Sequence, residues 1–278
     1  LGRAQVQVGV RLEDLEHRPA ADLPDYDELA LSLAAGVAID LRPGLRTKLN
    51  LARTERNPAA EELYSDGAHL ATRLFEIGLA PAGAGVAKEV SLNLDAGLEG
   101  QNGSVAWSVA GFVNDIADFV FLAPTGAEDD GLPVAVYTQD DARFWGAEAE
   151  LRWTLPEVGG FATSLRSFAD FVRAGRKGGG DLPRIPPWRV GIGVAGDRGP
   201  WRLAADATYH ARQDDISSSF TLVAVEASVA PRIGQLDWRF FVRGANLADE
   251  EARRSTSFLA AYAPLPGRSL LGGVRVAF

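Results

Sequence analysis

The stretch KEVSLNLDAGLE, residues 88–99, decides the fold. Its apolar side chains fall at every second position, and the positions between them are mostly polar; the apolar set is Val90, Leu92, Leu94, Ala96 and Leu98. Successive side chains of an extended chain point to opposite faces of a sheet, whereas a helix repeats its apolar positions every three to four residues. The stretch therefore predicts a β-strand with one apolar and one polar face.

The same alternation recurs along the whole chain, and no helical stripe of comparable length accompanies it. It predicts about twelve strands, near residues 3–13, 28–41, 45–55, 88–99, 104–121, 134–155, 161–172, 186–196, 201–212, 220–230, 236–246 and 269–278. Turn formers separate many of these segments, as they do in hairpins. We therefore expect an all-β, antiparallel protein.

The connections between these strands alternate between short and long. The short ones, rich in Gly and Pro, are residues 41–44, 99–103, 156–160, 196–200 and 231–235. The long ones are 14–27, 56–87, 122–133, 173–185, 213–219 and 247–268. Outer-membrane barrels have tight periplasmic turns and long external loops, so this rule favours a transmembrane β-barrel.

Charges and tryptophans support the same interpretation. Alternation alone also fits a half-exposed soluble sheet. Here, however, the polar face carries charges on nearly every strand: Arg11, Arg46, Lys48, Glu89, Asp95, Glu148, Glu150, Arg152, Arg202, Asp206, Arg239 and Arg243. Four of the six Trp adjoin the short turns, as in an interfacial girdle. We expect the polar face to line a watery lumen, with opposite charges paired across neighbouring strands.

Composition excludes several other classes of protein. The 278 residues carry 28 Lys+Arg against 37 Asp+Glu, a net charge of −9, which argues against a nucleic-acid partner. The absence of Cys excludes disulfides, Cys-ligated zinc and a thiol nucleophile. No signal peptide is visible; the chain begins at Leu1 and contains no Met, which suggests part of a longer or processed protein.

Three segments resemble the TonB-dependent outer-membrane receptor family. They are ARTERNPAAEELYSDGAHLATRLFEIG (52–78), FVNDIADFVF (112–121) and the closing stretch GANLADEEARRSTSFLAAYAPLPGRSLLGGVRVAF (244–278). Residues 88–99 also resemble the strand that follows the first of these in the family. The resemblance implies that residues 1–278 are the C-terminal portion of a barrel of about 22 strands. The family's plug domain, energy-coupling box and signal peptide have no counterpart in this sequence.

The resemblance also implies a function. We expect a receptor of the bacterial outer membrane for active uptake of a metal chelate, siderophore or metal ion, closest to the subgroup for zinc or other metals. Its expected partners are outer-membrane lipid, the barrel-assembly machinery and the TonB energy-coupling complex, which would act through the plug. Neither a cofactor nor an enzymatic activity is expected. The alternatives are a self-contained twelve-stranded pore, a translocator and a hydrolase with its site at the barrel rim.

The longest loop holds the candidate ligand-contacting residues, namely Glu62, Tyr64, Asp66, His69 and Glu76. Imidazole and carboxylate groups can hold a divalent transition metal, although such loops are more often simply solvated. His210 is expected to form hydrogen bonds in the lumen wall. The acidic residues Glu128, Asp129, Asp130, Asp140 and Asp141 read as a soluble loop tip or a cation-gathering patch.

The closing stretch contains the candidate assembly signal and its motif residues: Asn246, Asp249, Pro266, Gly267, Arg268 and Phe278. Asn246 and Asp249 follow a strand and are expected to cap the next loop by side chain–backbone hydrogen bonds. Pro266 and Gly267 are expected to form a turn before the last strand. A final strand that ends in Phe278 is similar to the signal read by the assembly machinery. In the element RRSTS (253–257), Ser255 stands where related receptors often carry His, which removes a potential metal ligand.

Overall fold

The protein is described by a computed structural model that covers all residues except 1–2, 20–22, 81–84, 214–217 and 278. One sheet contains all the strands. They are β1 (Ala4–His17), β2 (Tyr26–Arg42), β3 (Leu45–Arg56), β4 (Asp66–His69), β5 (Leu74–Ile77), β6 (Glu89–Asn102), β7 (Val105–Asp129), β8 (Leu132–Thr154), β9 (Ala162–Arg176), β10 (Arg189–Arg198), β11 (Trp201–His210), β12 (Phe220–Val229), β13 (Arg232–Ile233), β14 (Leu236–Ala245) and β15 (Ser269–Ala277). The one helix in the described residues is α1 (Ala60–Tyr64), and no helix there is long and apolar enough to cross a bilayer.

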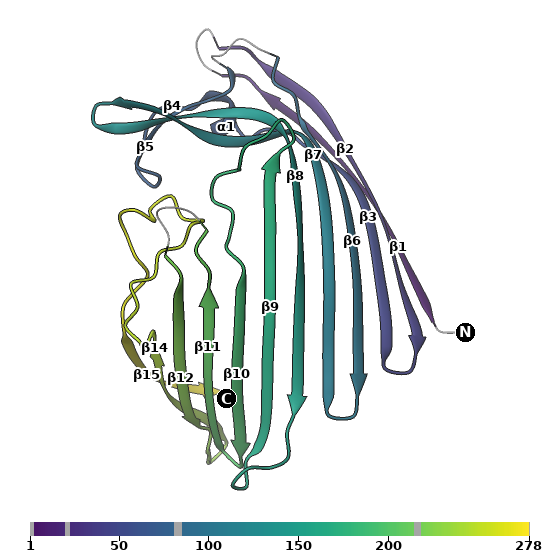
Figure 1. Cartoon of the computed structure of the whole chain (residues 1–278), viewed down its shortest axis with the longest axis vertical. Helices are drawn as coiled ribbons and strands as arrows, with labels where there is room; N and C mark the ends of the chain where they lie inside the picture. Colours follow the sequence, from purple (N-terminus) through teal and green to yellow (C-terminus); the bar gives the residue numbers. More distant parts are fainter. Residues whose placement is uncertain (1–2, 20–22, 81–84, 214–217, 278) are drawn as a thin grey trace.

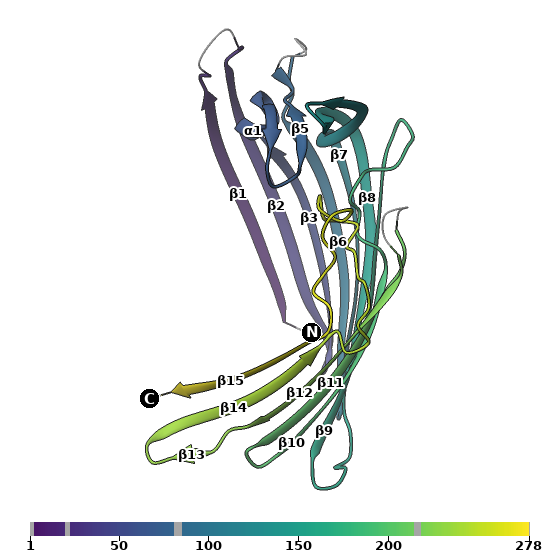
Figure 2. The same cartoon turned by 90° about the vertical axis from the view of Figure 1, so that its left-hand side faces the viewer.

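The all-β, antiparallel prediction is confirmed, and each of the twelve expected strands is present. β4, β5 and β13 are short additions. Each long strand pairs with the next one in the chain, and all pairs are antiparallel except β5 with β8. β1 and β15 form the two edges of a curved, open sheet, and no pairing joins them within the described residues (Figures 1 and 2).

The five predicted short turns gather at one end of the sheet, and the other connections, including the tip of the β7–β8 hairpin, lie at the opposite end (Figure 1). Trp107 and Trp201 stand at the starts of β7 and β11, and Trp153 stands near the end of β8, all beside short turns. Trp238 lies near the start of β14, beside the short turn that precedes this strand. The tryptophan girdle therefore coincides with the short-turn end.

The expected loop 122–133 is wrong, because these residues continue β7 and β8 as a paired hairpin. The strands end at Asp129 and Leu132, and the two residues between them, Asp130 and Gly131, have φ of 45° and 76°. An Asp-Gly pair with positive φ suits the tight turn that matches the twist of paired strands. The register shifts between Ile116 and Phe119, and the hairpin extension bends across the loop end of the sheet (Figure 1).

The region 56–87 was expected as one long loop, and it contains α1, β4 and β5. The helix begins where the backbone N–H of Ala59 donates to Glu62 Oε2 over 2.8 Å, which satisfies one of the unpaired donors at a helix start. β4 and β5 form a small hairpin, and β5 then pairs in parallel with the extension of β8. This arrangement holds the region against the β7–β8 extension.

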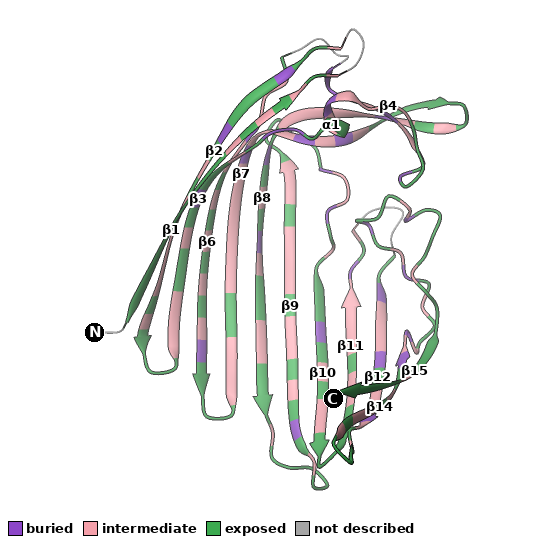
Figure 3. Cartoon of the chain, turned by 180° about the vertical axis from the view of Figure 1, so that it is seen from behind, coloured by how far each residue is buried: buried purple, intermediate pink, exposed green. Residues whose placement is uncertain are grey.

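Buried residues concentrate toward the long-loop end, whereas most of each long strand is partly or fully exposed (Figure 3). The core cluster consists of Ala142, Leu182 and Ile185, with Phe119 and Phe144 packed against it. The apolar face of β1 is bare; Val6 and Val8 are 71% and 77% exposed. An apolar face left uncovered along a sheet is what a lipid-facing surface requires.

The polar face is the concave one. The side chains that line one hollow of about 770 Å³ include Gln5, Lys48, Asp95, Glu148 and Arg189, which come from five strands. All five belong to the polar set of the alternation. The curvature of the sheet therefore turns its charged face inward and its apolar face outward.

Candidate functional site

The expected ion pairs across the polar face are present. Lys48 Nζ lies 2.7 Å from Glu99 Oε2, between β3 and β6. Arg166 pairs with Glu150 at 2.6 Å between β9 and β8. Further along, Arg189 pairs with Asp170 at 2.9 Å and Arg239 with Glu226 at 2.8 Å. Exposed pairs of this kind stabilise a fold only slightly, so their main effect is to arrange charge along the concave wall.

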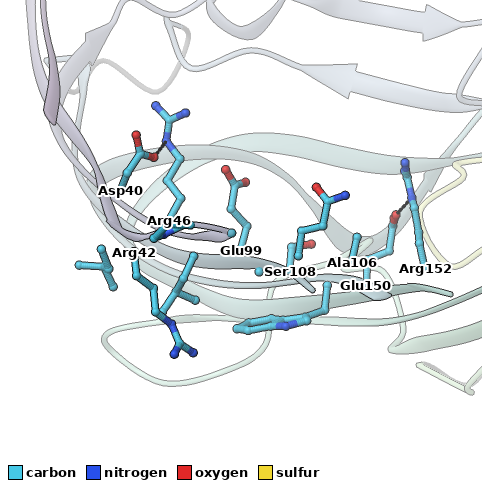
Figure 4. Close-up of a pocket in the computed structure, with 15 residues that line it drawn as sticks. Asp40, Arg42, Arg46, Glu99, Ala106, Ser108, Glu150 and Arg152 are labelled. Carbon is cyan, nitrogen blue, oxygen red and sulfur yellow. Dashed lines mark hydrogen bonds and ion pairs between the residues drawn. The ribbon is translucent and has the colours of Figure 1, made fainter. Parts of the chain in front are cut away.

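A hollow of about 970 Å³ lies at the short-turn end of this wall (Figure 4). Arg46 faces Asp40 at 3.7 Å, and Glu150 pairs with Arg152. Glu99 projects from the same side as Arg46, whereas Arg42 points the other way. The hollow is therefore lined by both signs of charge on one side of the sheet.

At the loop end, the structure brings two predicted residues together around a buried carboxylate. Glu76 on β5 is 4% exposed, and His69 Nδ1 at the end of β4 lies 3.3 Å from its Oε1. Thr72 donates to the same oxygen over 2.5 Å, and Tyr137 on β8 donates to Oε2 over 3.3 Å. We call His69, Thr72, Glu76 and Tyr137 the Glu76 cluster. Burial, followed by the nearby Glu76 carboxylate, raises the pKa of Tyr137 to about 12.

Glu62 belongs to a second group, centred on Arg56 at the end of β3. Arg56 contacts Glu62 through two nitrogens, at 2.8 and 3.2 Å, and Glu89 at 2.6 and 2.8 Å. The Glu89 side chain is 9% exposed, and it also accepts the backbone N–H of Val120 over 2.8 Å. One carboxylate therefore ties β3, β6 and β7 together at the base of the loops.

The remaining loop candidates are placed apart from these groups. Tyr64 donates to the carbonyl of Pro24 over 3.0 Å, and burial raises the pKa of its phenol. Asp66 is the exposed first residue of β4. Across the described part of the chain, no group of three or more His, Asp or Glu side chains is arranged to hold a metal ion. Ligand contact by the five candidates stays a prediction.

The closing motif packs as a unit between β14 and β15. Asn246 Nδ2 donates to the carbonyls of Glu250 and Pro266 over 2.9 and 3.1 Å, and Asp249 Oδ1 accepts the N–H of Arg268 over 2.8 Å. These are the side chain–backbone hydrogen bonds expected for Asn246 and Asp249. The turn expected at Pro266 and Gly267 is wrong, because both residues lie in irregular backbone. Hydrogen bonds from Asn246 to the Pro266 carbonyl and from the Arg268 N–H to Asp249 hold this segment in place of a turn. Phe278 lies outside the described residues, so its role as an assembly signal stays a prediction.

Two arginine–aromatic contacts that the sequence does not predict join three external connections. The guanidinium of Arg73 lies 4.4 Å from the ring centre of Tyr262, and that of Arg184 lies 4.0 Å from the ring centre of Phe258. Both arginines have positive φ, 58° and 60°. Burial lowers the pKa of Arg184. No local sequence pattern predicts these contacts, because the two partners of each contact are far apart in the sequence.

His210 and the acidic residues occupy separate places. His210, at the outer end of β11, stacks on Phe220 with ring centres 4.5 Å apart. Its expected hydrogen-bonding role stays a prediction. Asp140 pairs with Arg176 at 3.6 Å, and Asp141 accepts the N–H of Asp118 over 3.3 Å, so this acidic pair is bound into the base of the β7–β8 extension.

Comparisons with known proteins agree with this architecture. A family model described as "TonB dependent receptor-like, beta-barrel" matches residues 1–247. The copper transporter OprC is 20% identical with a TM-score of 0.78, over 98% of this chain and 44% of its own. The FrpB iron transporter from Neisseria meningitidis (F3-3 variant) is 14% identical with a TM-score of 0.70, over 99% and 43%. BauA, the ferric preacinetobactin receptor from Acinetobacter baumannii, is 14% identical with a TM-score of 0.69, over 98% and 40%. This chain thus spans less than half the length of each of these structures, and identities this low show a shared fold.

Proposed function

Because the chain belongs to the TonB-dependent receptor-like β-barrel family, we propose that it is the C-terminal portion of an outer-membrane receptor that takes up a metal ion, metal chelate or siderophore. Uptake is energised by the TonB complex through a plug domain elsewhere in the receptor. The apolar face contacts outer-membrane lipid, and the barrel-assembly machinery inserts the chain. The names of three fold relatives support this class of cargo: a copper transporter, an iron transporter and a ferric preacinetobactin receptor.

The open sheet supports the assignment to part of a larger barrel. β1 and β15 each present an unpaired edge within the described residues. Unpaired backbone groups are not tolerated in a bilayer, so the proposal places additional strands between these edges. The chain covers 40–44% of the three relatives, which leaves room for those strands in a protein of their size.

The observation that carries the proposal is the placement of charge. The concave face is lined by ion pairs from the short turns upward, and the external connections contact one another above it through the Arg73–Tyr262 and Arg184–Phe258 pairs. A charged channel beneath joined external loops suits capture of a polar, charged cargo from outside. A closed lipid-facing exterior and a wet interior are what such a route requires.

The alternatives expected from sequence gain no support from the geometry. A twelve-stranded pore needs pairing between β1 and β15, which the described residues do not show. For a rim-site hydrolase, Ser255 and His210 do line one pocket, but Ser255 Oγ donates to the carbonyl of Ile185 over 3.0 Å. The Ser255 hydroxyl is therefore engaged in a structural hydrogen bond between two loops, and we propose no enzymatic role.

Deletion of the complete gene tests the proposal. Cells limited in turn for zinc, copper and iron, with the metal free or chelated, should lose high-affinity uptake of at least one form. Complementation should restore uptake, and restoration should require an active TonB complex. Unchanged uptake of every metal and chelate tested would contradict the proposed function.

A further inference from the structure

The β14–β15 connection folds against the outer end of the polar face and encloses a separate pocket of about 260 Å³. One wall comes from the RRSTS element, through Arg253, Arg254, Ser255 and Thr256. The opposite wall comes from strand ends, with Arg189 on β10 and His210 on β11 among its residues. The element that lacks the family's usual His is therefore part of a built cavity.

The strand register explains why the side chains of the strand-end wall converge. Arg189 is the cross-strand partner of both Asp170 on β9 and His210 on β11, and His210 is the partner of Phe220 on β12. Directly opposed residues of antiparallel strands project from the same face. Asp170, Arg189, His210 and Phe220 consequently form one row on the concave face, with the His210 ring stacked on buried Phe220.

The wall formed by the RRSTS element is fixed by the Ser255 hydroxyl. Ser255 is 5% exposed and donates to the carbonyl of Ile185 in the β9–β10 connection over 3.0 Å. Arg253 is also fully engaged, since it contacts Glu251 at 2.8 and 3.0 Å and donates to the carbonyl of Ala260 over 2.6 Å. These contacts fix the two chain neighbours of Arg254, and they position Arg254 at the pocket while its own side chain takes no part in them.

Two guanidinium groups in the pocket have N–H donors without a hydrogen-bond partner in the described structure. Arg189 reaches both oxygens of Asp170 through Nε alone, at 2.9 and 3.1 Å, which leaves its two Nη groups without a hydrogen bond in the described structure. The side chain of Arg254 forms no hydrogen bond or ion pair with the residues that the structure describes. Among the lining residues that the structure describes, Asp170 is the single carboxylate, and Arg253 is already paired with Glu251. Arg189 and Arg254 therefore leave the described lining with one positive charge in excess.

We propose that this pocket binds a small oxyanion, through a carboxylate or phosphate group held between Arg189 and Arg254. Planar guanidinium groups with free N–H donors suit both groups, which they bind through short, charge-assisted hydrogen bonds. The His210–Phe220 stack supplies a flat aromatic surface for the rest of the molecule. As the recognition site for an anionic cargo, the pocket rests on the proposed uptake function and adds its chemical class.

Calorimetric titration of the complete, detergent-solubilised receptor tests the pocket. At low ionic strength we expect binding of citrate, of inorganic phosphate, or of both, and the two arms tell a carboxylate site from a phosphate site. Triethyl citrate, which lacks the charges, should not bind. Arg254→Gln should weaken anion binding by about 10- to 100-fold, the range for losing hydrogen bonds to a charged group. Asp170→Asn should strengthen it.

Arg232→Gln is the matched control, because Arg232 is an exposed arginine at the short-turn end, distant in the fold from this pocket. It should leave anion affinity unchanged. The proposal is overturned if neither anion binds the wild-type receptor, or if Arg254→Gln and Arg232→Gln have equal affinity. Circular dichroism of Arg254→Gln shows whether the barrel is intact.

The pocket and the uptake function can fail separately. Loss of uptake on gene deletion, combined with unaltered anion binding in Arg254→Gln, overturns the pocket and keeps the receptor. Anion binding that depends on Arg254, in a receptor whose deletion leaves all uptake unchanged, overturns the uptake function and keeps the pocket.

Discussion

Tyr137 donates a hydrogen bond to Glu76 Oε2 over 3.3 Å and thereby joins β8 to the β4–β5 hairpin. The two residues lie on strands that pair in parallel, with Glu76 opposite Ala135. Parallel pairing is slightly less stable per residue than antiparallel pairing, and three residues of each strand take part here. The side-chain contact therefore supplements a weak backbone attachment.

Tyr137→Phe should loosen this attachment without unfolding the barrel. The change removes one hydrogen bond to a buried carboxylate, which still accepts from Thr72, so we expect a local cost of about 1 kcal/mol. Hydrogen exchange of residues 74–77 should accelerate severalfold. Tyr262→Phe provides the control, since it keeps the ring that Arg73 contacts. Equal exchange in the two variants would contradict the structural role of the Tyr137 hydroxyl.

The same phenol predicts a pH dependence. The pKa of Tyr137 is raised from 10.0 to about 12 by burial and then by Glu76, so the folded loop favours the neutral phenol. A raised pKa gives stability that is complete below pH 10 and is lost as the pH rises to about 12. Proteolysis of the β4–β5 hairpin should increase across this window in the wild type and stay flatter in Tyr137→Phe. Phenolate absorbance gives the titration directly. If the wild type and Tyr137→Phe had the same pH profile, Tyr137 would not be the group whose titration loosens the hairpin.

The strands could be predicted because each carries its own signal. Alternation in residues 88–99 and Gly- or Pro-rich short turns are local features, and they hold whatever packs nearby. The β7–β8 extension was missed because APTGAEDDGLP (123–133) has the composition of a loop. Its Asp130–Gly131 pair is also a hairpin signal, and the structure shows that the turn residues outweighed the loop-like composition.

The candidate site could be predicted only where its members are close in sequence. His69 and Glu76 were grouped because one loop carries both, and they lie 3.3 Å apart. Tyr137 and Arg184 were missed because their positions depend on long-range pairing of β5 with β8 and on a contact with Phe258. Contacts over such separations leave no period or spacing for a single sequence to display.

Arg56→Gln should destabilise the base of the loops. Arg56 neutralises Glu89, which is 9% exposed, and also holds Glu62 of α1. Removing the cation leaves a largely buried carboxylate without its partner, and because Arg56 is itself 45% exposed, we expect a cost of about 2 kcal/mol, below the figure for a fully buried pair. Urea unfolding of the reconstituted receptor measures this cost.

Arg232→Gln serves as the control for the loop base. Arg232 and Asp237 lie 3.9 Å apart and are 75% and 74% exposed, so their loss should cost less than about 0.5 kcal/mol. If Arg56→Gln were no more destabilised than Arg232→Gln, the Glu62–Arg56–Glu89 contacts would have no role in loop stability.

Gly191→Ala should disturb the concave wall, whereas Gly193→Ala, two residues along the same face of β10, should not. The ring of Phe168 lies over Gly191, its cross-strand partner, so a Cβ there would overlap the ring; at Gly193 the nearest atoms are an ordinary 3.5 Å away. The guanidinium carbons of Arg166 and Arg189 lie 5.6 and 5.8 Å from the centre of the Phe168 ring. Displacing the ring would therefore disturb both contacts. We expect a loss of about 1–3 kcal/mol, measured by urea unfolding of the reconstituted receptor. Phe168→Leu should restore part of it in the double variant; equal stability of the two alanine variants would show that the ring yields without cost.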